Sequence, residues 1–288
     1  DSPLVLVGLL GALLIQYPRL FSQPFINDDY LILDATRAVP FWRLWHASTL
    51  LFGWFRPWSR EVHYWTIQHL FGAAPLPFHL VSAALWMTVL WSYFTLLRRI
   101  AGPRVAHIAV AAVAALACWG SPLLWAAGAQ DLWALCFGLA ALHLVVRDRP
   151  GLAAPLLLLA LLSKESAAML WPVAVGYCGI VLKVPLGHAL RRTWPLALTV
   201  AAWGGLHPTL RDRFFGHLAH DAHAVGLLDA VARVGEALGQ LAVIGHQEQA
   251  RGVLVEPPHG HEAFALGGWQ AVHHRAGIVR IAPRADDA

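Results

Sequence analysis

Charged residues are scarce in this chain. Asp, Glu, Lys and Arg make up 13% of the 288 residues, whereas a soluble domain carries about 25%. Lysine occurs only twice, as Lys164 and Lys183. The net charge of +4 is spread along the chain, without the concentrated basic patch that attracts nucleic acid. An ordinary soluble domain is therefore excluded, and no nucleic-acid partner is expected.

Cysteine is also rare. Cys118, Cys136 and Cys178 all lie inside apolar stretches, so they predict small buried or lipid-facing residues and no disulfide framework. Apolar residues are what the chain has in abundance, at 58% of the total. They form long runs over the first two thirds of the sequence. Because such a surface needs lipid as its solvent, the composition predicts an all-α, polytopic membrane protein.

The apolar runs give the number of membrane spans. A helix needs about 20 apolar residues to cross the bilayer, and the runs predict a bundle of about seven spans. The first run has no basic n-region and no A-x-A cleavage site, so it is interpreted as a span rather than a signal peptide. The fifth run is the shortest. The expected spans are residues 3–20, 76–97, 105–121, 123–146, 151–163, 166–183 and 193–207.

Basic connectors indicate the orientation. The short segments "RRIAGPR" (98–104), "RDRP" (147–150) and "KVPLGHALRR" (183–192) fall on one side of the predicted bundle. The positive-inside rule makes that side cytoplasmic. Loop 21–75 and the "SKES" turn then face the outside. We expect a multi-pass protein of a bacterial inner membrane, with its site facing the periplasm or exterior.

Loop 21–75 is rich in tryptophan, with Trp42, Trp45, Trp54, Trp58 and Trp65. Such side chains favour the lipid headgroup layer, so one or two amphipathic helices are expected along the outer membrane surface. A compact loop packed on the bundle is the alternative. Glu61 and His63 in this loop are expected to be surface groups.

The chain becomes polar after residue 207. We therefore divide it into a transmembrane module, 1–207, and an extracytoplasmic tail, 208–288, in which 226–245 has helical periodicity. His217, His220 and His223 have the spacing of metal ligands on one helix face. A solvated amphipathic segment is the favoured interpretation of these histidines.

Asp28 and Asp29 lie just after the first apolar run. An adjacent acidic pair could bind a divalent cation, magnesium or manganese, through its oxygen atoms. One of the two could instead be a general base, its pKa raised by its neighbour. The pair could also simply cap a surface helix.

Polar residues from other segments are expected on the same side of the membrane. Charged groups at membrane depth are expensive and usually serve a site or a partner. Each also has a structural alternative: Lys164 and Glu165 could pair with each other, Arg56 could reach lipid phosphates, and Asp131 or His79 could stabilise neighbouring helices. The candidates are Arg56, Arg60, His79, Gln130, Asp131, Lys164 and Glu165.

Four segments in this order resemble a known family. The "NDD" pair, "FRPWSREVHYWTIQHLFGAAPLPFHLVSAALW", "GSPLLWAAGAQDLWALCFGLAAL" and "LLALLSKESAAMLWP" are similar to segments of the GT-C membrane glycosyltransferases. The similarity is greatest to the dolichyl-phosphate-mannose protein mannosyltransferase branch and its bacterial relatives. It covers residues 4–206. The polar tail departs from the family, in which many members continue with further spans and a soluble domain.

The resemblance implies a function for these residues. A polyprenyl-phosphate sugar would enter from the bilayer, and the sugar would pass with inversion to a glycan, lipid or protein acceptor. Asp28 or Asp29 would be the general base. Arg56, Lys164 and Arg60 would hold the donor phosphate, with His79, Asp131 and Glu165 in the same substrate-binding site.

Two other functions use the same charges. A transporter or flippase of a lipid-linked or anionic substrate would bind it without a base, although no internal repeat typical of transporters is evident. A catalytically inactive relative would serve as a membrane scaffold.

Overall fold

A computed structural model describes residues 2–46 and 54–210. All regular structure among these residues is helical, which confirms the all-α prediction. The chain divides into two units, residues 1–222 and 223–288, and every described residue belongs to the first. The predicted boundary at residue 207 stays a prediction. His217, His220 and His223 lie outside the described residues.

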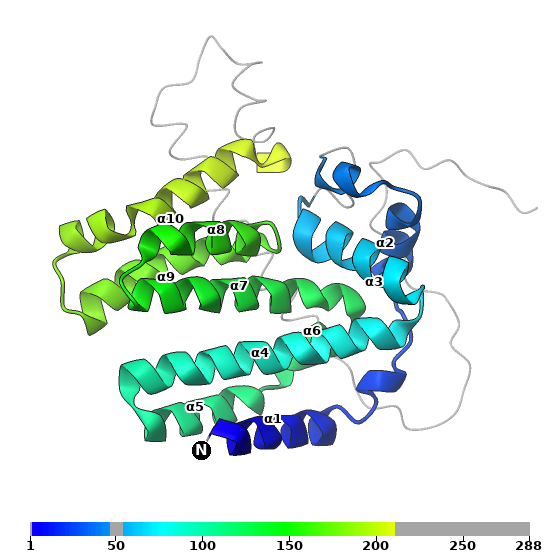
Figure 1. Cartoon of the computed structure of the whole chain (residues 1–288), viewed down its shortest axis with the longest axis horizontal. Helices are drawn as coiled ribbons and strands as arrows, with labels where there is room; N and C mark the ends of the chain where they lie inside the picture. Colours follow the sequence, from blue (N-terminus) through cyan, green and yellow to red (C-terminus); the bar gives the residue numbers. More distant parts are fainter. Residues whose placement is uncertain (1, 47–53, 211–288) are drawn as a thin grey trace, which may run out of the picture. The chain divides into compact units, whose positions relative to one another are not determined.

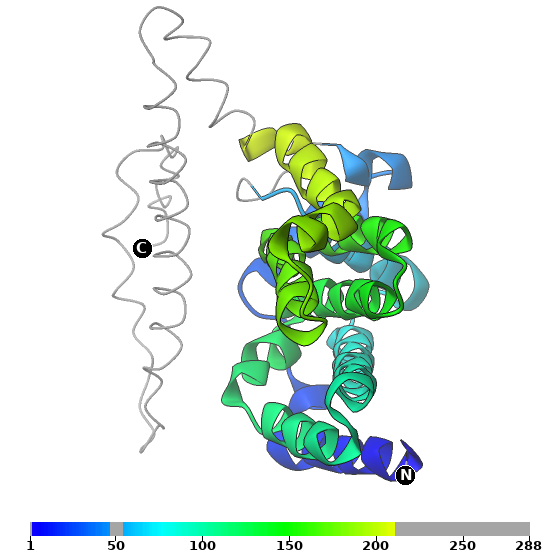
Figure 2. The same cartoon turned by 90° about the vertical axis from the view of Figure 1, so that its left-hand side faces the viewer.

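The longer helices of the first unit run back and forth beside one another (Figure 1). α4 packs against α5 and α7, α7 packs on α8, and α8 packs on α10. α1 contacts α4 and α5, while α9 contacts α10. Figure 2 shows the order α1, α4, α7 and α8 nearly end-on. The bounds are α1 Ser2–Gln16, α4 Pro75–Ala101, α5 Pro103–Ala114, α7 Ala129–Val146, α8 Pro150–Leu161, α9 Leu170–Gly176 and α10 Leu186–Leu206.

Proline and glycine set several helix ends. α4, α5 and α8 begin at Pro75, Pro103 and Pro150, in the first turn, where the missing N–H removes no helical hydrogen bond. Gly102 separates α4 from α5 with φ of +88°. Glycine adopts this backbone conformation without a Cβ clash, so the chain can reverse directly after Ala101.

The prediction of about seven spans is wrong by helix length and composition. Only Pro75–Ala101 and Ala126–Val146 are long and apolar enough to cross a membrane in the described part, and a pair bent by 57°, Pro103–Ala114 with Ala117–Leu124, makes a third if counted as one span.

The other apolar runs form shorter or interrupted helices. α8 has 12 residues and is about 18 Å long, and Glu165–Val181 combines 3-10, α and π turns. The runs are apolar, but their helices break before they reach bilayer length. Two or three candidate spans nevertheless indicate a membrane protein.

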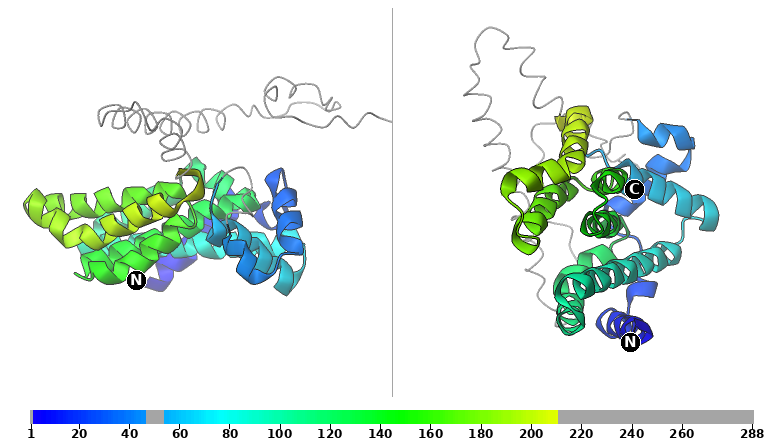
Figure 3. Two further views of the ribbon diagram at one scale, coloured as in Figure 1. Left: turned by 90° about the horizontal axis from the view of Figure 1, so that it is seen from above. Right: turned by 60° about the vertical axis from the view of Figure 1, so that its left-hand side comes forward.

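The described residues of loop 21–75 form short helices at one end of the long ones, where α4 and α7 begin and α8 and α10 end (Figures 1 and 3). α2 packs on α3, and the π-helical turn η4 packs on α7. The loop thus forms two α-helices, but it is packed on the bundle, as in the alternative interpretation. Its helices are η1 Leu20–Ser22, α2 Asp28–Arg37, η2 Phe41–Trp45, η4 Pro57–Val62 and α3 His63–Phe71.

Candidate functional site

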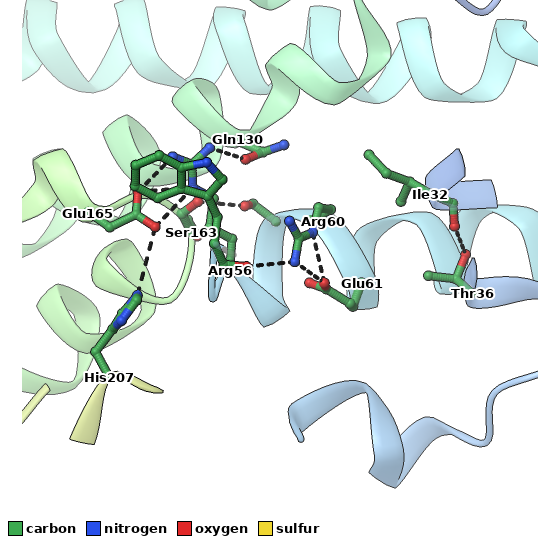
Figure 4. A network of polar contacts seen from close by, with 11 residues as sticks. Ile32, Thr36, Arg56, Arg60, Glu61, Gln130, Ser163, Glu165 and His207 are labelled. Atoms are coloured by element: carbon green, nitrogen blue, oxygen red, sulfur yellow. Dashed lines mark hydrogen bonds and ion pairs between the residues drawn. The ribbon is translucent and has the colours of Figure 1, made fainter. Parts of the chain in front are cut away.

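Arg56 joins three segments at this end of the bundle (Figure 4). Its Nε donates to both carboxylate oxygens of Glu165, at 3.1 and 2.9 Å, and its Nη2 lies 2.7 Å from Oε2. Nη1 donates to Gln130 Oε1 at 2.7 Å. The guanidinium also lies 4.9 Å from the ring centroid of Trp54. These contacts use the planar fork of arginine, which lysine does not have.

Lys164 and Asp131 form a second ion pair nearby, with Nζ 2.7 Å from Oδ1. Lys164 has extended backbone angles, φ −158° and ψ 138°, between α8 and the 3-10 turn η7, Glu165–Met169. In extended backbone, successive side chains point to opposite sides. Lys164 can therefore reach Asp131 while Glu165 reaches Arg56.

One backbone and one side-chain hydrogen bond hold η4 against the turn that follows α8. Trp58 N donates to Leu162 O at 3.2 Å, and Ser59 Oγ donates to Ser163 O at 2.7 Å. Both Ser59 and Ser163 are buried. The segment that carries Arg56 is thus fixed to the segment that carries Glu165, although more than 100 residues separate them.

Asp29 is completely buried and fully engaged. Its Oδ1 accepts from Tyr64 Oη at 2.6 Å and from Ala127 N at 2.9 Å, and its Oδ2 accepts from Ile26 N at 3.0 Å. Burial, followed by the charges of Asp29 and Asp28, raises the pKa of Tyr64 well above its usual value. Asp29 therefore connects α2 to α3 and to the 3-10 turn η6, Ala126–Gly128.

Asp28 differs from Asp29 because it is only half-buried and has no hydrogen-bond partner in the described ranges. It is the second central residue of a tight turn closed by a hydrogen bond of 3.1 Å from Asp29 N to Ile26 O. Asn27 in that turn has φ of +48° and ψ of −117°, which are close to the first central position of a type II′ turn, where glycine and asparagine are preferred. The Asp28 carboxylate is therefore partly accessible to solvent, whereas that of the neighbouring Asp29 is buried.

His79 is buried in α4, and both ring nitrogens face carbonyl oxygens. Nδ1 lies 3.2 Å from Leu123 O, and Nε2 lies 3.1 Å from Gln23 O. A neutral imidazole can donate to only one of the two, whereas an imidazolium donates to both. His79 thus joins α4 to loop 21–75 and to α6, Gly120–Leu124, and it is not exposed to a ligand in this conformation.

Glu61 and His63 are not surface groups, contrary to the sequence prediction. Both are buried, and Glu61 pairs with Arg60, whose Nη2 also donates to Trp54 O at 2.7 Å. Burial raises the pKa of Glu61, although Arg60 opposes the shift. Burial also lowers the pKa of His63 to about 4. Its Nδ1 accepts from Trp133 Nε1 at 3.2 Å. The sequence alone does not indicate this burial, because Glu61 and His63 are polar residues that are usually exposed.

Some of the predicted site residues meet at the start of α7, whereas Arg60 and His79 make their contacts elsewhere. Asp29 binds Ala127, Arg56 binds Gln130, and Lys164 binds Asp131. Ala127 and Asp131 are four residues apart, about 6 Å along a helix. The convergence of segments is therefore observed. It is produced by paired charges, with each cation next to a carboxylate.

An apolar groove of about 420 Å³ lies between α8 and α10 beside this network. Trp203 and His207 line it, and Trp203 Nε1 and His207 Nε2 are buried without a hydrogen-bond partner in the described part of the chain. His207 Nδ1 accepts from Leu210 N at 3.3 Å, so a neutral ring carries its proton on Nε2. That nitrogen lies 4.0 Å from Glu165 Oε1, and burial lowers the pKa of His207 despite the opposing effect of Glu165. Sequence reasoning missed both donors, because their burial depends on the packing of α10.

A metal site has no ligand set in the described ranges, which contain no group of three or more His, Cys, Asp or Glu side chains placed to hold an ion. Both oxygen atoms of Asp29 already accept hydrogen bonds from the protein. Magnesium or manganese at Asp28 and Asp29 would therefore need other ligands.

The helices and their polar end define an all-α membrane protein with two or three candidate spans. No protein-family model, curated protein sequence or solved structure matches the chain.

Proposed function

We propose that this chain is a membrane glycosyltransferase that uses a polyprenyl-phosphate sugar at the extracytoplasmic face of a bacterial inner membrane. The observation that carries the proposal is the apolar groove between α8 and α10, which is lined by Trp203 and His207 and lies next to the ion-paired network of Arg56 and Glu165. The resemblance of the four segments to GT-C enzymes gives the reaction class.

The groove fits the two halves of such a donor. A lipid chain would bury its apolar surface between Leu158, Leu162 and Leu198. The donor phosphate would lie at the polar end of the groove, where His207 lines it and the Arg56–Glu165 ion pair lies next to His207.

Lys164 is the cation best suited to bind the phosphate. The side chains of Lys164 and Asp131 are 28% and 39% exposed, and such exposed ion pairs contribute only about 0–1 kcal/mol. Lys164 can therefore exchange Asp131 for a phosphate at small cost. Arg56 and Glu165 are 17% and 20% exposed and share several bonds, so Arg56 acts as a structural clamp.

Asp28 is the carboxylate that can act as the general base. It takes the proton of the acceptor hydroxyl, whose oxygen attacks the anomeric carbon as the bond from that carbon to the phosphate oxygen breaks. Negative charge grows on the leaving phosphate, so a nearby Lys164 stabilises the transition state more than the ground state. Asp29 holds the structure that presents Asp28.

One observation favours the inactive scaffold instead. Arg56 and Lys164 are each neutralised by a carboxylate, so the network is complete without a ligand. A scaffold would keep these pairs and transfer no sugar.

The two lysines provide a matched test. Membranes containing wild type, Lys164→Gln or Lys183→Gln are supplied with radiolabelled polyprenyl-phosphate sugars, and transferred label is measured. The proposal predicts transfer by wild type and Lys183→Gln, with a loss of at least tenfold in Lys164→Gln. Absence of transfer by wild type from every donor would contradict the enzyme and favour the scaffold. Movement of the lipid between leaflets without transfer would favour the flippase.

A further inference from the structure

A second groove, of about 450 Å³, lies between α2 and α3. This volume is within the range of small-molecule sites, about 300–1,000 Å³. The two helices lie side by side (Figures 1 and 3). The side chains that give the groove its chemistry are Tyr30, Asp34, Arg37, Gln68 and His69. None of them belongs to the site described above.

Hydrogen bonds hold two of these side chains in place. Gln68 Nε2 donates to Thr36 Oγ1 at 3.1 Å, and Thr36 Oγ1 donates to Ile32 O at 2.7 Å. His69 Nδ1 lies 2.7 Å from Trp65 O, and its ring stacks on Trp65 with centroids 4.1 Å apart. A carbonyl can only accept, so Nδ1 carries the proton and the neutral ring keeps Nε2 as an acceptor.

The two opposite charges in the groove disfavour a ligand that carries a net charge of either sign. Asp34 and Arg37 both line it and lie one helical turn apart on α2. No ion pair or hydrogen bond engages either side chain within residues 2–46 and 54–210. An anion would meet Asp34 and a cation would meet Arg37. A neutral ligand with hydroxyl groups can donate to the carboxylate and accept from the guanidinium, and hydrogen bonds to charged groups are the stronger kind.

Tyr30 adds an apolar surface. Its side chain is 58% exposed, and it contacts Phe25 edge-on, with centroids 6.1 Å apart. A partly exposed aromatic ring with a polar tip suits a ligand that has both C–H faces and hydroxyl groups.

We infer that the α2–α3 groove binds a neutral saccharide. The fixed amide of Gln68, the acceptor nitrogen of His69, the opposite charges of Asp34 and Arg37 and the exposed ring of Tyr30 together match a polyhydroxylated ring. The site is separate from Asp28, which lies near the start of α2, about 9 Å along the helix axis from Asp34. The inference concerns binding and holds whether or not the chain transfers sugar.

Saturation-transfer NMR tests the inference with the full chain in lipid nanodiscs, which avoids sugar-based detergents. The probes are maltose, cellobiose and mannobiose, with glycine betaine, a zwitterion, and inorganic phosphate, an anion, as comparisons. We expect saturable binding of at least one disaccharide, weakened at least tenfold in Tyr30→Ala and in Asp34→Ala. Asp148→Asn is the matched control, because Asp148 is exposed, lies in the turn between α7 and α8 and has a φ of +61° that asparagine also adopts, and it should bind like wild type.

Three outcomes would overturn the inference: no saccharide binding, equal binding by the groove variants, or stronger binding of betaine or phosphate than of every disaccharide. Asp28→Asn separates this site from the proposed enzyme. It should bind disaccharide like wild type, even where sugar transfer is lost. Saccharide binding by a wild type that never transfers sugar would retain the groove and reject only the enzyme.

Discussion

Asp29 Oδ1 accepts a hydrogen bond of 2.9 Å from the backbone N–H of Ala127, 98 residues further along the chain. The same oxygen atom accepts from Tyr64. One buried carboxylate therefore fixes two helices of loop 21–75, α2 and α3, to the start of α7, where the polar network is assembled. This gives the two neighbouring aspartates different roles.

The first prediction concerns Asp29 and Asp28. Asp29→Ala removes the acceptor of three hydrogen bonds, and each buried donor left without a partner costs about 1–3 kcal/mol. We expect a loss of about 3 kcal/mol or more in the free energy of unfolding. Asp28→Ala, at a half-buried side chain without a hydrogen-bond partner in the described residues, should change it by less than about 0.5 kcal/mol. Thermal unfolding in nanodiscs measures both, and equal effects would reject the division of roles.

The second prediction concerns the close packing of Gly128. A Cβ atom at this position would lie 2.5 Å from Ser121 O and 2.8 Å from Pro122 Cα, which are backbone atoms that cannot easily move. Gly128→Ala should destabilise the protein by about 1–3 kcal/mol and disturb the contacts of Ala127 and Gln130. Gly11→Ala is the matched control, because no atom lies within 4 Å of its added Cβ and alanine favours the helix. Unfolding of the two variants at the same temperature would contradict this packing.

The third prediction separates the two ion pairs. Arg56→Lys loses the bidentate contact with Glu165 and the bond to Gln130, so we expect a loss of about 1–3 kcal/mol in stability, the usual range for coupled polar groups. Lys164→Gln breaks a more exposed pair and should cost less than about 1 kcal/mol. Chemical denaturation compares the two variants. A larger loss for Lys164→Gln would show that Lys164, and not Arg56, is the structural cation.

The fourth prediction is a dependence of stability on pH. Burial lowers the pKa of His63 from 6.5 to about 4, so the unfolded chain binds the proton more readily. The contribution of His63 is complete above pH 6.5 and is lost as the pH falls towards 4, by about 3 kcal/mol in total. The raised pKa of Glu61 acts in the opposite direction. His63→Gln keeps an acceptor for Trp133, and its stability should change less than that of wild type between pH 6.5 and 4. Parallel curves for the two proteins would contradict the assignment.

The sequence predicted the helical class and the two strongest spans, because long apolar runs such as 76–97 are a direct signal. It overestimated the number of spans, because the positions at which a helix breaks within apolar sequence depend on packing. Glu165–Val181, with its 3-10, α and π turns, is an example. From the basic connectors, the sequence predicted that Arg56, Lys164 and Asp131 lie on the same side of the membrane. In the structure, Lys164 and Asp131 form an ion pair. The sequence could not distinguish Asp28 from Asp29. That difference depends on contacts with Tyr64 and Ala127, which are distant in sequence.

The most direct test of the central claim compares sugar transfer by wild type, Asp28→Asn and Asp148→Asn in membranes, from pH 5 to 9. Bound donor and thermal stability are measured on the same samples. We predict that Asp28→Asn remains folded, binds the donor and loses at least 100-fold in transfer rate, a typical contribution of a general base. Asp148→Asn should match wild type across the range. Normal transfer by Asp28→Asn, with the pH profile of wild type, would contradict the claim that Asp28 is the base.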